Sequence, residues 1–338
     1  MLSFCGRGTC CGRVKGEAFH MASMGALDVI LALAKVFIMI LPGYIIMKLG
    51  IINTNHTQGV SNIITYVTYP CLVIAAMQME FSMEKLENCG YVVMIFIGVV
   101  IIAMIISKIL TSIIKLPVSQ SGIMAFMMVF GNTGFLGLPV LNGLFGKEGV
   151  FYGAICDSSF DVLMFTIGVT LIRQAAKGEE KMGFKETVSG LINPCFIGVL
   201  IGLLFYVCRI TLPPILGGPV EMIGNATSPL AMMVVGAHLA RISFKDMFTS
   251  KPAYLVCLLK LLVAPAVALI LVKLIIGGGT LFGTVIIMEA AMPCAMLSVI
   301  LSERYHADVE FATKGVMLTT ILSLITIPIV AIALQSII

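Results

Sequence analysis

The sequence predicts an all-α polytopic membrane protein, and three observations support this class. Of the 338 residues, 59% are hydrophobic and only 11% are charged, whereas soluble domains carry roughly 25% charged residues. Ten stretches are long and apolar enough to cross a bilayer, and motifs of the first half recur in the second. The composition excludes a disordered chain, a disulfide-rich secreted module and a nucleic-acid-binding protein, because the net charge of +4 is thinly spread.

The predicted spans follow from length, since a membrane helix needs about 20 mostly apolar residues. In chain order they cover residues 26–48, 58–79, 90–113, 119–143, 148–173, 187–208, 215–239, 253–276, 281–302 and 308–334. Only short polar segments separate them, so no loop is long enough to hold a soluble domain.

The domain organisation expected from these spans is two halves of five helices each. The first repeat covers residues 25–174, a cytoplasmic linker covers 175–186, and the second repeat covers 187–338. Residues 1–24 form a polar head that we expect to be disordered or not native. Three of the ten cysteines lie in this head without metal-site spacing, and the other seven are expected to behave as small buried hydrophobes.

Charge predicts the orientation, because cytoplasmic loops hold an excess of Lys and Arg. The loops after odd-numbered spans carry eleven such residues: Lys48, Lys108, Lys115, Arg173, Lys177, Lys181, Lys185, Arg241, Lys245, Lys251 and Arg304. The loops after even-numbered spans carry four: Lys85, Lys147, Arg209 and Lys273. The odd loops are therefore predicted to be cytoplasmic and both termini extracytoplasmic, in a multi-pass protein of the plasma membrane.

The two halves repeat each other. A Thr-x-Pro ends at Pro70 in span two and at Pro229 in span seven, 159 residues apart, and a similar offset of 161 sets Asn132 of span four against Pro293 of span nine. Because each half has an odd number of spans, the halves must insert with opposite topology. Inverted repeats of this kind are typical of secondary transporters, which bind substrates near the midplane at broken helices.

Spans four and nine contain the predicted breaks. Residues 130–139 hold three glycines and a proline, and Pro293 interrupts span nine near its middle. Two breaks at matching positions would bring half-helix N-termini together, which suits an anion; the alternative is a pair of packing kinks. The candidate substrate-binding residues are Gly131, Asn132, Thr133, Met292, Pro293 and Cys294. The Asn132 amide can donate two hydrogen bonds to a carboxylate.

Four charged residues within the predicted spans need an explanation, because each costs about 2.5–3.5 kcal/mol there. Asp157 and Asp161 share a helix face, Glu289 lies one turn before Pro293, and Lys260 lies in span eight. The functional interpretation makes these residues candidates for coupling to a proton or Na⁺. The alternative is an internal ion pair with Lys260 that fixes helix packing, or a Lys260 that faces the substrate carboxylate.

The chain resembles the auxin efflux carrier family, which includes bacterial malonate and malate permease-like proteins and plant PIN-type carriers. The resemblance covers about residues 25–338 and lies in residues 41–44, 48–52, 66–72 and above all 132–139 (Asn-Thr-Gly-Phe-Leu-Gly-Leu-Pro). Residues 293–328 are similar to the family's last two helices. The long cytoplasmic loop of many plant members is missing, which points to the bacterial members.

The resemblance implies ten helices in two inverted five-helix repeats, with helices four and nine unwound and crossing. It also implies a scaffold domain of spans one, two, six and seven, against which a mobile transport domain moves as an elevator. In PIN-type carriers an Asn at the crossover meets the substrate carboxylate, and this role carries over to Asn132. Those carriers usually have a Pro at the break, whereas this chain has Gly131.

The function predicted from the sequence is secondary active transport of a small organic anion such as a mono- or dicarboxylate. The partners expected are this substrate and membrane lipids, with a homodimer left open and no cofactor beyond a coupling proton or Na⁺. An alternative is a non-transporting membrane sensor that binds an amphipathic lipid or sterol at the same crossover. A channel is disfavoured by the paired breaks. An intramembrane aspartyl hydrolase is disfavoured because Asp157 and Asp161 lie on one helix, so no enzyme activity is expected.

Overall fold

The computed structural model describes residues 25–114, 116–175, 193–241 and 247–337, and most of these residues are helical. Within these residues there is no strand, only an isolated bridge between Gly131 and Cys294. By length and composition, six helices can cross a membrane: Ala26–Lys48, Thr54–Ala76, Met83–Ile114, Thr133–Arg173, Lys251–Ile275 and Val309–Gln335. The chain is therefore an all-helical, multi-pass membrane protein, as its composition predicts.

The first half of the chain forms helices over the first five predicted spans. Their bounds are α2 (Ala26–Ile38), α3 (Ile40–Lys48), α4 (Thr54–Ile63), η1 (Ile64–Thr68), α5 (Tyr69–Ala76), α6 (Met83–Ile114), α7 (Val118–Val129), η2 (Thr133–Gly137), α8 (Leu138–Leu163), η3 (Met164–Gly168) and α9 (Val169–Ala175). The η elements are π-helical turns continuous with their neighbours. Span four is interrupted between α7 and η2, where the glycines predict a break.

The second half forms helices over the other five predicted spans. Their bounds are α11 (Pro194–Val207), α12 (Pro214–Asn225), α13 (Thr227–Ala240), α15 (Lys251–Leu258), η4 (Leu259–Val263), α16 (Ala264–Ile275), α17 (Leu281–Ala290), α18 (Leu297–Arg304) and α19 (Val309–Ile337). Span nine is interrupted between α17 and α18, at Pro293. The boundary between spans four and five differs in form from the prediction: α8 runs across it, with one non-helical residue at Gly146 (φ 59°, ψ −145°).

Three of the π-helical turns end two residues before a proline. Thr68 precedes Pro70, Gly137 precedes Pro139, and Val263 precedes Pro265. A proline within a helix lacks an N–H and its ring clashes with the carbonyl four residues earlier. A wider turn relieves that clash and leaves the helix continuous.

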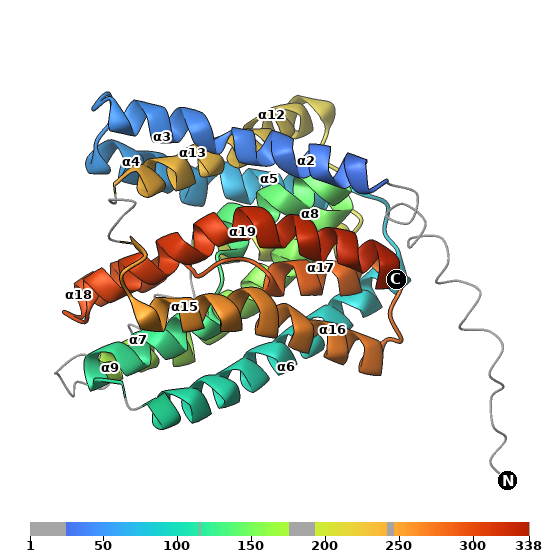
Figure 1. The fold of residues 1–338 in the computed structure, drawn as a ribbon. Helices are drawn as coiled ribbons and strands as arrows, with labels where there is room; N and C mark the ends of the chain where they lie inside the picture. The colour runs from blue at the N-terminus through green and yellow to red at the C-terminus, as the bar shows by residue number, and fades with distance from the viewer. Residues whose placement is uncertain (1–24, 115, 176–192, 242–246, 338) are drawn as a thin grey trace, which may run out of the picture.

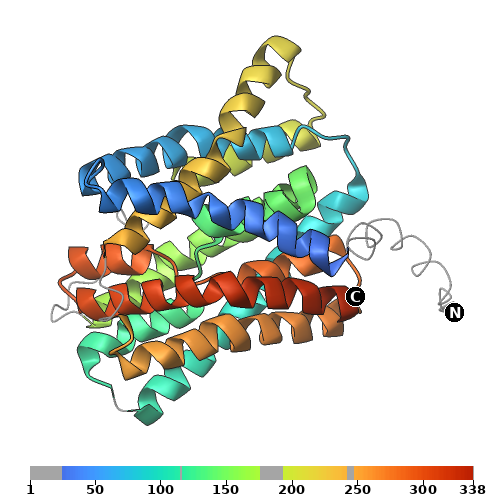
Figure 2. The same ribbon diagram turned by 45° about the horizontal axis from the view of Figure 1, so that its top comes forward.

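The helices pack into two groups that each draw on both halves of the sequence. The small bundle comprises α2–α5 and α11–α13, in which α13 contacts α3 and both α11 and α12 contact α5. The large bundle comprises α6–α9 and α15–α19. Figures 1 and 2 show the blue and yellow helices of the small bundle on one side of the green, orange and red helices. The helices α2, α5 and α13 contact α8, so α8 lies at the boundary between the bundles.

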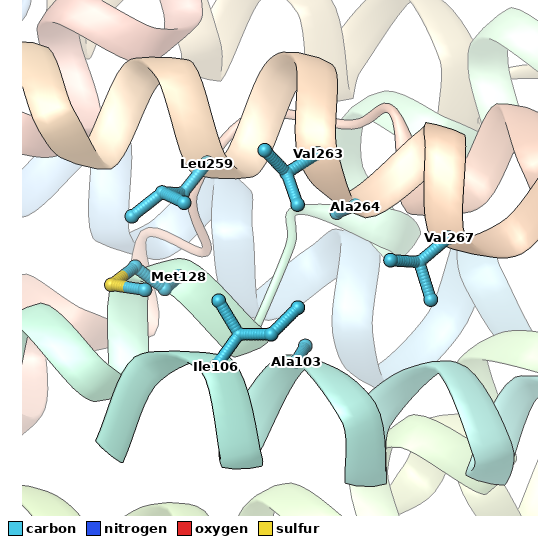
Figure 3. Close-up of a pocket in the computed structure, with 7 residues that line it drawn as sticks. All are labelled: Ala103, Ile106, Met128, Leu259, Val263, Ala264 and Val267. Carbon is cyan, nitrogen blue, oxygen red and sulfur yellow. The ribbon is translucent and has the colours of Figure 1, made fainter. Parts of the chain in front are cut away.

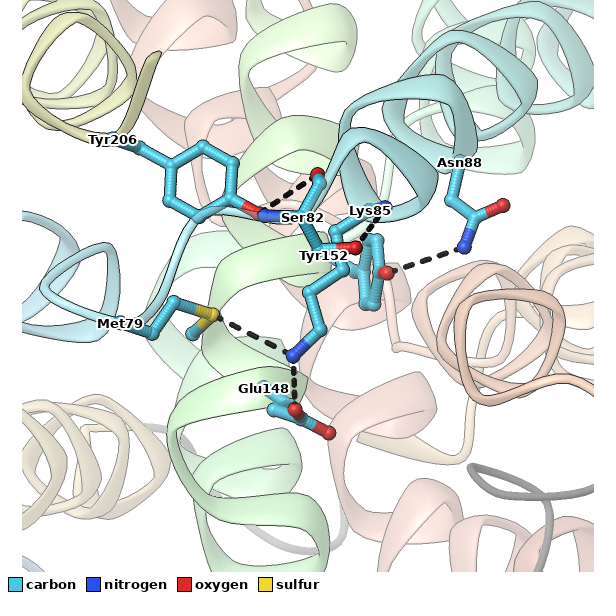
Figure 4. A network of polar contacts seen from close by, with 7 residues as sticks. All are labelled: Met79, Ser82, Lys85, Asn88, Glu148, Tyr152 and Tyr206. Carbon is cyan, nitrogen blue, oxygen red and sulfur yellow. Dashed lines mark hydrogen bonds and ion pairs between the residues drawn. The ribbon is translucent and has the colours of Figure 1, made fainter. Parts of the chain in front are cut away.

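A polar network at one end of the molecule joins Ser82 and the first turn of α6 to α8 and α11 (Figure 4). Lys85 pairs with Glu148 of α8, and the Ser82 backbone N–H donates to the Tyr206 hydroxyl of α11 at 2.9 Å. This end carries even-numbered loops, which the charge pattern predicts to be extracytoplasmic.

Some expectations fall on residues outside the described ranges. These are the polar head 1–24 with its three cysteines and almost all of the linker 175–186. The seven cysteines within the described residues are free thiols: Cys71, Cys89, Cys156, Cys195, Cys208, Cys257 and Cys294. Four of them are buried; Cys71 and Cys195 are half-buried, and Cys208 is exposed, contrary to the expectation for that residue.

Candidate functional site

The two helix breaks cross each other at the backbone level. The Asn132 N–H donates to the Pro293 carbonyl at 2.7 Å, and the Ala295 N–H donates to the Phe130 carbonyl at 3.0 Å. Gly131 and Cys294 form an antiparallel bridge between these two bonds. Asn132 and Pro293, which the repeat aligns, are therefore in direct contact. The two segments are held together at the crossing by main-chain hydrogen bonds, which do not depend on side-chain identity.

The start of η2 presents unused donors at this crossing. The Asn132 carbonyl accepts from the N–H groups of Leu136 (3.3 Å) and Gly137 (3.1 Å), so the N–H groups of Thr133 to Phe135 lack intrahelical partners. The Asn132 side chain is only 7% exposed, and its amide has no hydrogen-bond partner in the described ranges. Since η2 continues into α8, this end of a long helix also carries a partial positive charge.

Lys260 brings a full positive charge to the same point. It lies in η4, is 2% exposed, and its Nζ donates to the Val129 carbonyl at 3.4 Å, at the C-terminal end of α7. A Cβ placed on Gly131 would lie 2.9 Å from this Nζ and 3.4 Å from the Met292 carbonyl oxygen. The ammonium therefore occupies the space that a side chain at position 131 would need.

Lys260 has no carboxylate partner in the described part of the chain. The ion pairs found there join Lys85 with Glu148, Lys147 with Glu221 and Lys314 with Glu310. Among the described residues Lys260 forms no ion pair with Asp161 or Glu289, and its role at the crossing stays a prediction. Glu289 is the carboxyl group that faces this ammonium, without forming an ion pair with it, and a buried charge without an ion-pair partner is unfavourable.

Asp157 of α8 links the crossing to the small bundle. Its carboxylate accepts hydrogen bonds from the Thr133 hydroxyl of η2 and from the Tyr69 hydroxyl of α5, and it is 6% exposed. Both partners donate to the charged form, which is the stronger kind of hydrogen bond. Asp157 therefore positions Thr133 and ties it across the boundary between the bundles.

Asp161 follows one helical turn later and has a similar contact. It accepts from the Asn193 side-chain amide at 2.8 Å, while the Asn193 side-chain oxygen caps α11 by accepting from the Phe196 N–H at 2.7 Å. Asp157 and Asp161 thus share the α8 face that meets the small bundle. Asp161 does not contact the crossing itself.

Glu289 approaches the crossing from α17 and is fully buried. Its carboxyl group lies against Gly137 of η2, where an added Cβ would overlap it, and 3.3 Å from a Cβ placed on Gly153. Of the predicted residues, the structure thus brings Gly131, Asn132, Thr133, Met292, Pro293 and Cys294 together, with Lys260, Asp157 and Glu289 around them.

Two cavities lie away from these residues. The first is about 10 Å³ and is lined by apolar side chains of α6, α7, η4 and α16 (Figure 3), which is at most room for one water. The second is about 380 Å³ and lies beside the network of Figure 4, lined by residues 77–81, 205–206 and 209–211. Arg209 lies in it with its guanidinium 4.7 Å from the Phe81 ring centre. Neither cavity contains a candidate site residue.

Three contributors were not predicted as site residues: Tyr69, Asn193 and Thr319. The Thr319 hydroxyl of α19 accepts from the Cys294 N–H at 3.2 Å and fixes the segment between α17 and α18 at the crossing. One sequence feature could have identified Tyr69, because it precedes Pro70 in the repeated Thr-x-Pro motif. No sequence feature identifies Asn193 or Thr319, since their hydrogen-bond partners are distant in sequence.

Comparisons with known proteins match this chain to a family of membrane transport proteins. Residues 28–331 match the family model described as membrane transport protein. An uncharacterized transporter of Methanocaldococcus jannaschii is 28% identical over 304 residues, covering 89% of this chain and 96% of that protein. An uncharacterized transporter of Methanothermobacter thermautotrophicus is 28% identical over 323 residues, covering 93% of this chain and 100% of that protein.

Proposed function

The chain belongs to the membrane transport protein family, the family of the auxin efflux carriers, and from this membership we propose that it is a secondary active transporter of a small organic anion. The substrate is a mono- or dicarboxylate that binds at the crossing of helices four and nine. Membership confirms the resemblance noted in the sequence and supports a transporter in place of an enzyme.

One observation supports the choice of an anion: the buried ammonium of Lys260 forms no ion pair among the described residues and lies against Gly131, next in sequence to unused hydrogen-bond donors. The Asn132 amide and the first N–H groups of η2 complete a site with one full and one partial positive charge. A carboxylate would accept from these donors and neutralise the ammonium. The site residues are Gly131, Asn132, Thr133, Met292, Pro293, Cys294 and Lys260.

The proposed mechanism is alternating access by an elevator movement within a fold of ten transmembrane helices in two inverted repeats. The large bundle carries the crossing and moves against the small bundle, which serves as the scaffold. The separation of helix contacts into two bundles supports this division. The boundary between them passes along α8, where Asp157 and Asp161 each accept one hydrogen bond from the small bundle. Such bonds must break in each transport cycle.

The test is exchange of labelled acids by purified protein in liposomes, using malonate, malate, succinate, lactate and indole-3-acetate. We expect the wild type to exchange one of these acids. Asn132→Ala should lower that exchange by at least about tenfold, because a hydrogen bond to a charged group contributes about 1.5–3 kcal/mol.

The matched control is Asn62→Ala, which removes an exposed amide from α4 and should leave exchange unchanged. Near-normal exchange by Asn132→Ala would contradict the site. Saturable binding of an acid or a lipid without any exchange by the wild type would contradict transport and favour a sensor.

A further inference from the structure

Glu289 is the buried acid that the anion site leaves unexplained. It lies near the end of α17, one turn before Pro293, and is 0% exposed. Neither of its carboxyl oxygens has a hydrogen-bond partner within the described residues. Asp157 differs, because both of its oxygens accept bonds from hydroxyl groups.

Two glycines leave the space that the Glu289 carboxyl group occupies. Gly137 and Gly153 approach it with no side chains, and a Cβ on Gly153 would also lie 2.9 Å from a methyl carbon of Leu138 and would overlap one of Leu141. The carboxyl group therefore lies against the two glycines, and a side chain at either position would meet it. A carboxylate without donors in such a place is strongly unfavourable, whereas the neutral acid is tolerated.

The ionisable groups that face Glu289 come from two elements. Asp157 and Cys156 face it from α8, and Lys260 faces it from η4. None of the three is bonded to it. The other elements packed against α17, namely α6, α16 and α19, present no charged group to it among the described residues.

We propose that Glu289 carries the proton that couples anion transport to a proton gradient. This inference rests on the proposed function. Its carboxylate takes one proton from the water on one side of the membrane, becomes the neutral acid when the anion binds, and returns the proton on the other side when the anion leaves. No other bond forms or breaks.

The positions of Lys260 and Glu289 explain why the anion and the proton move together. The anion neutralises Lys260 at one end of the crossing, and the proton neutralises Glu289 at the other end. Gly137, which touches the Glu289 carboxyl, ends the same π-helical turn that begins after Asn132. With both bound, the charges of Lys260 and Glu289 are neutralised, and the large bundle can move with its site enclosed.

A proton fits this position better than Na⁺. A sodium ion at a transporter site is coordinated by several oxygen atoms, including unwound backbone carbonyls. Neither Glu289 carboxyl oxygen has a polar partner within the described residues, and no cluster of three acidic, His or Cys side chains exists in the described ranges. A proton needs only the carboxyl oxygen.

The experiment uses full-length protein in liposomes with labelled malonate, or the acid of the panel that the wild type exchanges best. The membrane potential is clamped at zero, and a gradient of one pH unit is imposed. One proton carried per anion would sustain an accumulation of about tenfold. Glu289→Gln should still exchange malonate at a measurable rate but accumulate none. Glu303→Gln, an exposed acid on α18, is the control and should accumulate as the wild type does.

Accumulation by Glu289→Gln equal to that of the wild type would overturn the proton role while leaving the proposed function standing. If this variant does not fold, an internal pH dye in wild-type liposomes decides the question. Proton entry with the anion supports the inference, and anion entry without proton movement overturns it. If the wild type exchanges no acid at all, the proposed function fails first, and this inference fails with it.

Discussion

Lys260 and Gly131 depend on each other at the crossing. The ammonium stands where a side chain at position 131 would begin, 2.9 Å from the Cβ position. A side chain at position 131 would therefore require the buried lysine to move. The pair also places a positive charge at the residue before Asn132, which the sequence alone could not establish.

Removal of this charge should weaken anion binding without unfolding the protein. We expect Lys260→Met to lower the affinity for the exchanged acid about 10- to 100-fold, since a charged hydrogen bond contributes about 1.5–3 kcal/mol. The melting temperature without substrate should stay equal or rise, because an unpaired buried charge is replaced by an apolar side chain of similar length. Titration calorimetry measures the affinity. Lys273→Met, which changes an exposed lysine of α16, is the control; an unchanged affinity in Lys260→Met would contradict the anion site.

The break residues were predictable from sequence because Gly and Pro act through local backbone geometry. Asn132 and Pro293 were identified in this way, and the structure places them in contact. Tyr69, Asn193 and Thr319 were not, because hydrogen bonds between residues 88, 32 and 25 positions apart depend on tertiary packing. The same reason applies to the ion pair considered for Lys260, because the sequence shows which charged residues lie in the predicted spans but not which of them meet.

At the scale of elements, α8 joins the site to the boundary between the bundles. Its face carries Asp157 and Asp161 one turn apart, and each accepts a hydrogen bond from the small bundle. The sequence predicted the shared face from the i,i+4 spacing. It predicted cation coupling for both residues, whereas their contacts favour a role in holding the two bundles in this arrangement.

The Tyr69 bond provides a test of that role. If the bundles slide during transport, Tyr69→Phe removes one bond that must break in each cycle, worth about 1 kcal/mol, and exchange at saturating substrate should rise roughly fivefold. The melting temperature should fall, because Asp157 loses a donor. Tyr66→Phe alters an exposed hydroxyl one turn earlier and should change neither quantity. An exchange rate that is unchanged or lower in Tyr69→Phe would contradict the sliding boundary.

For the whole molecule, the sequence predicted the helical membrane class, the positions of the helices and the two helix breaks. These features were predictable because apolar stretches, glycines and prolines determine helix formation locally. It divided the chain into halves at residues 175–186, and this division by repeat remains a prediction. The spatial bundles follow a different division, since α2–α5 pack with α11–α13 across the two halves. Orientation also remains a prediction from the distribution of Lys and Arg.

The central claim is that the crossing binds a carboxylate, and thermal unfolding of the purified protein tests it most directly. A ligand that binds only the folded state raises the melting temperature by mass action. We predict that one acid among malonate, malate, succinate, lactate and indole-3-acetate raises the wild-type melting temperature in a saturable way, and that the shift disappears in Asn132→Ala and Lys260→Met. A shift of equal size in both variants would place the acid elsewhere, and the absence of any shift with all five acids would contradict the anion site.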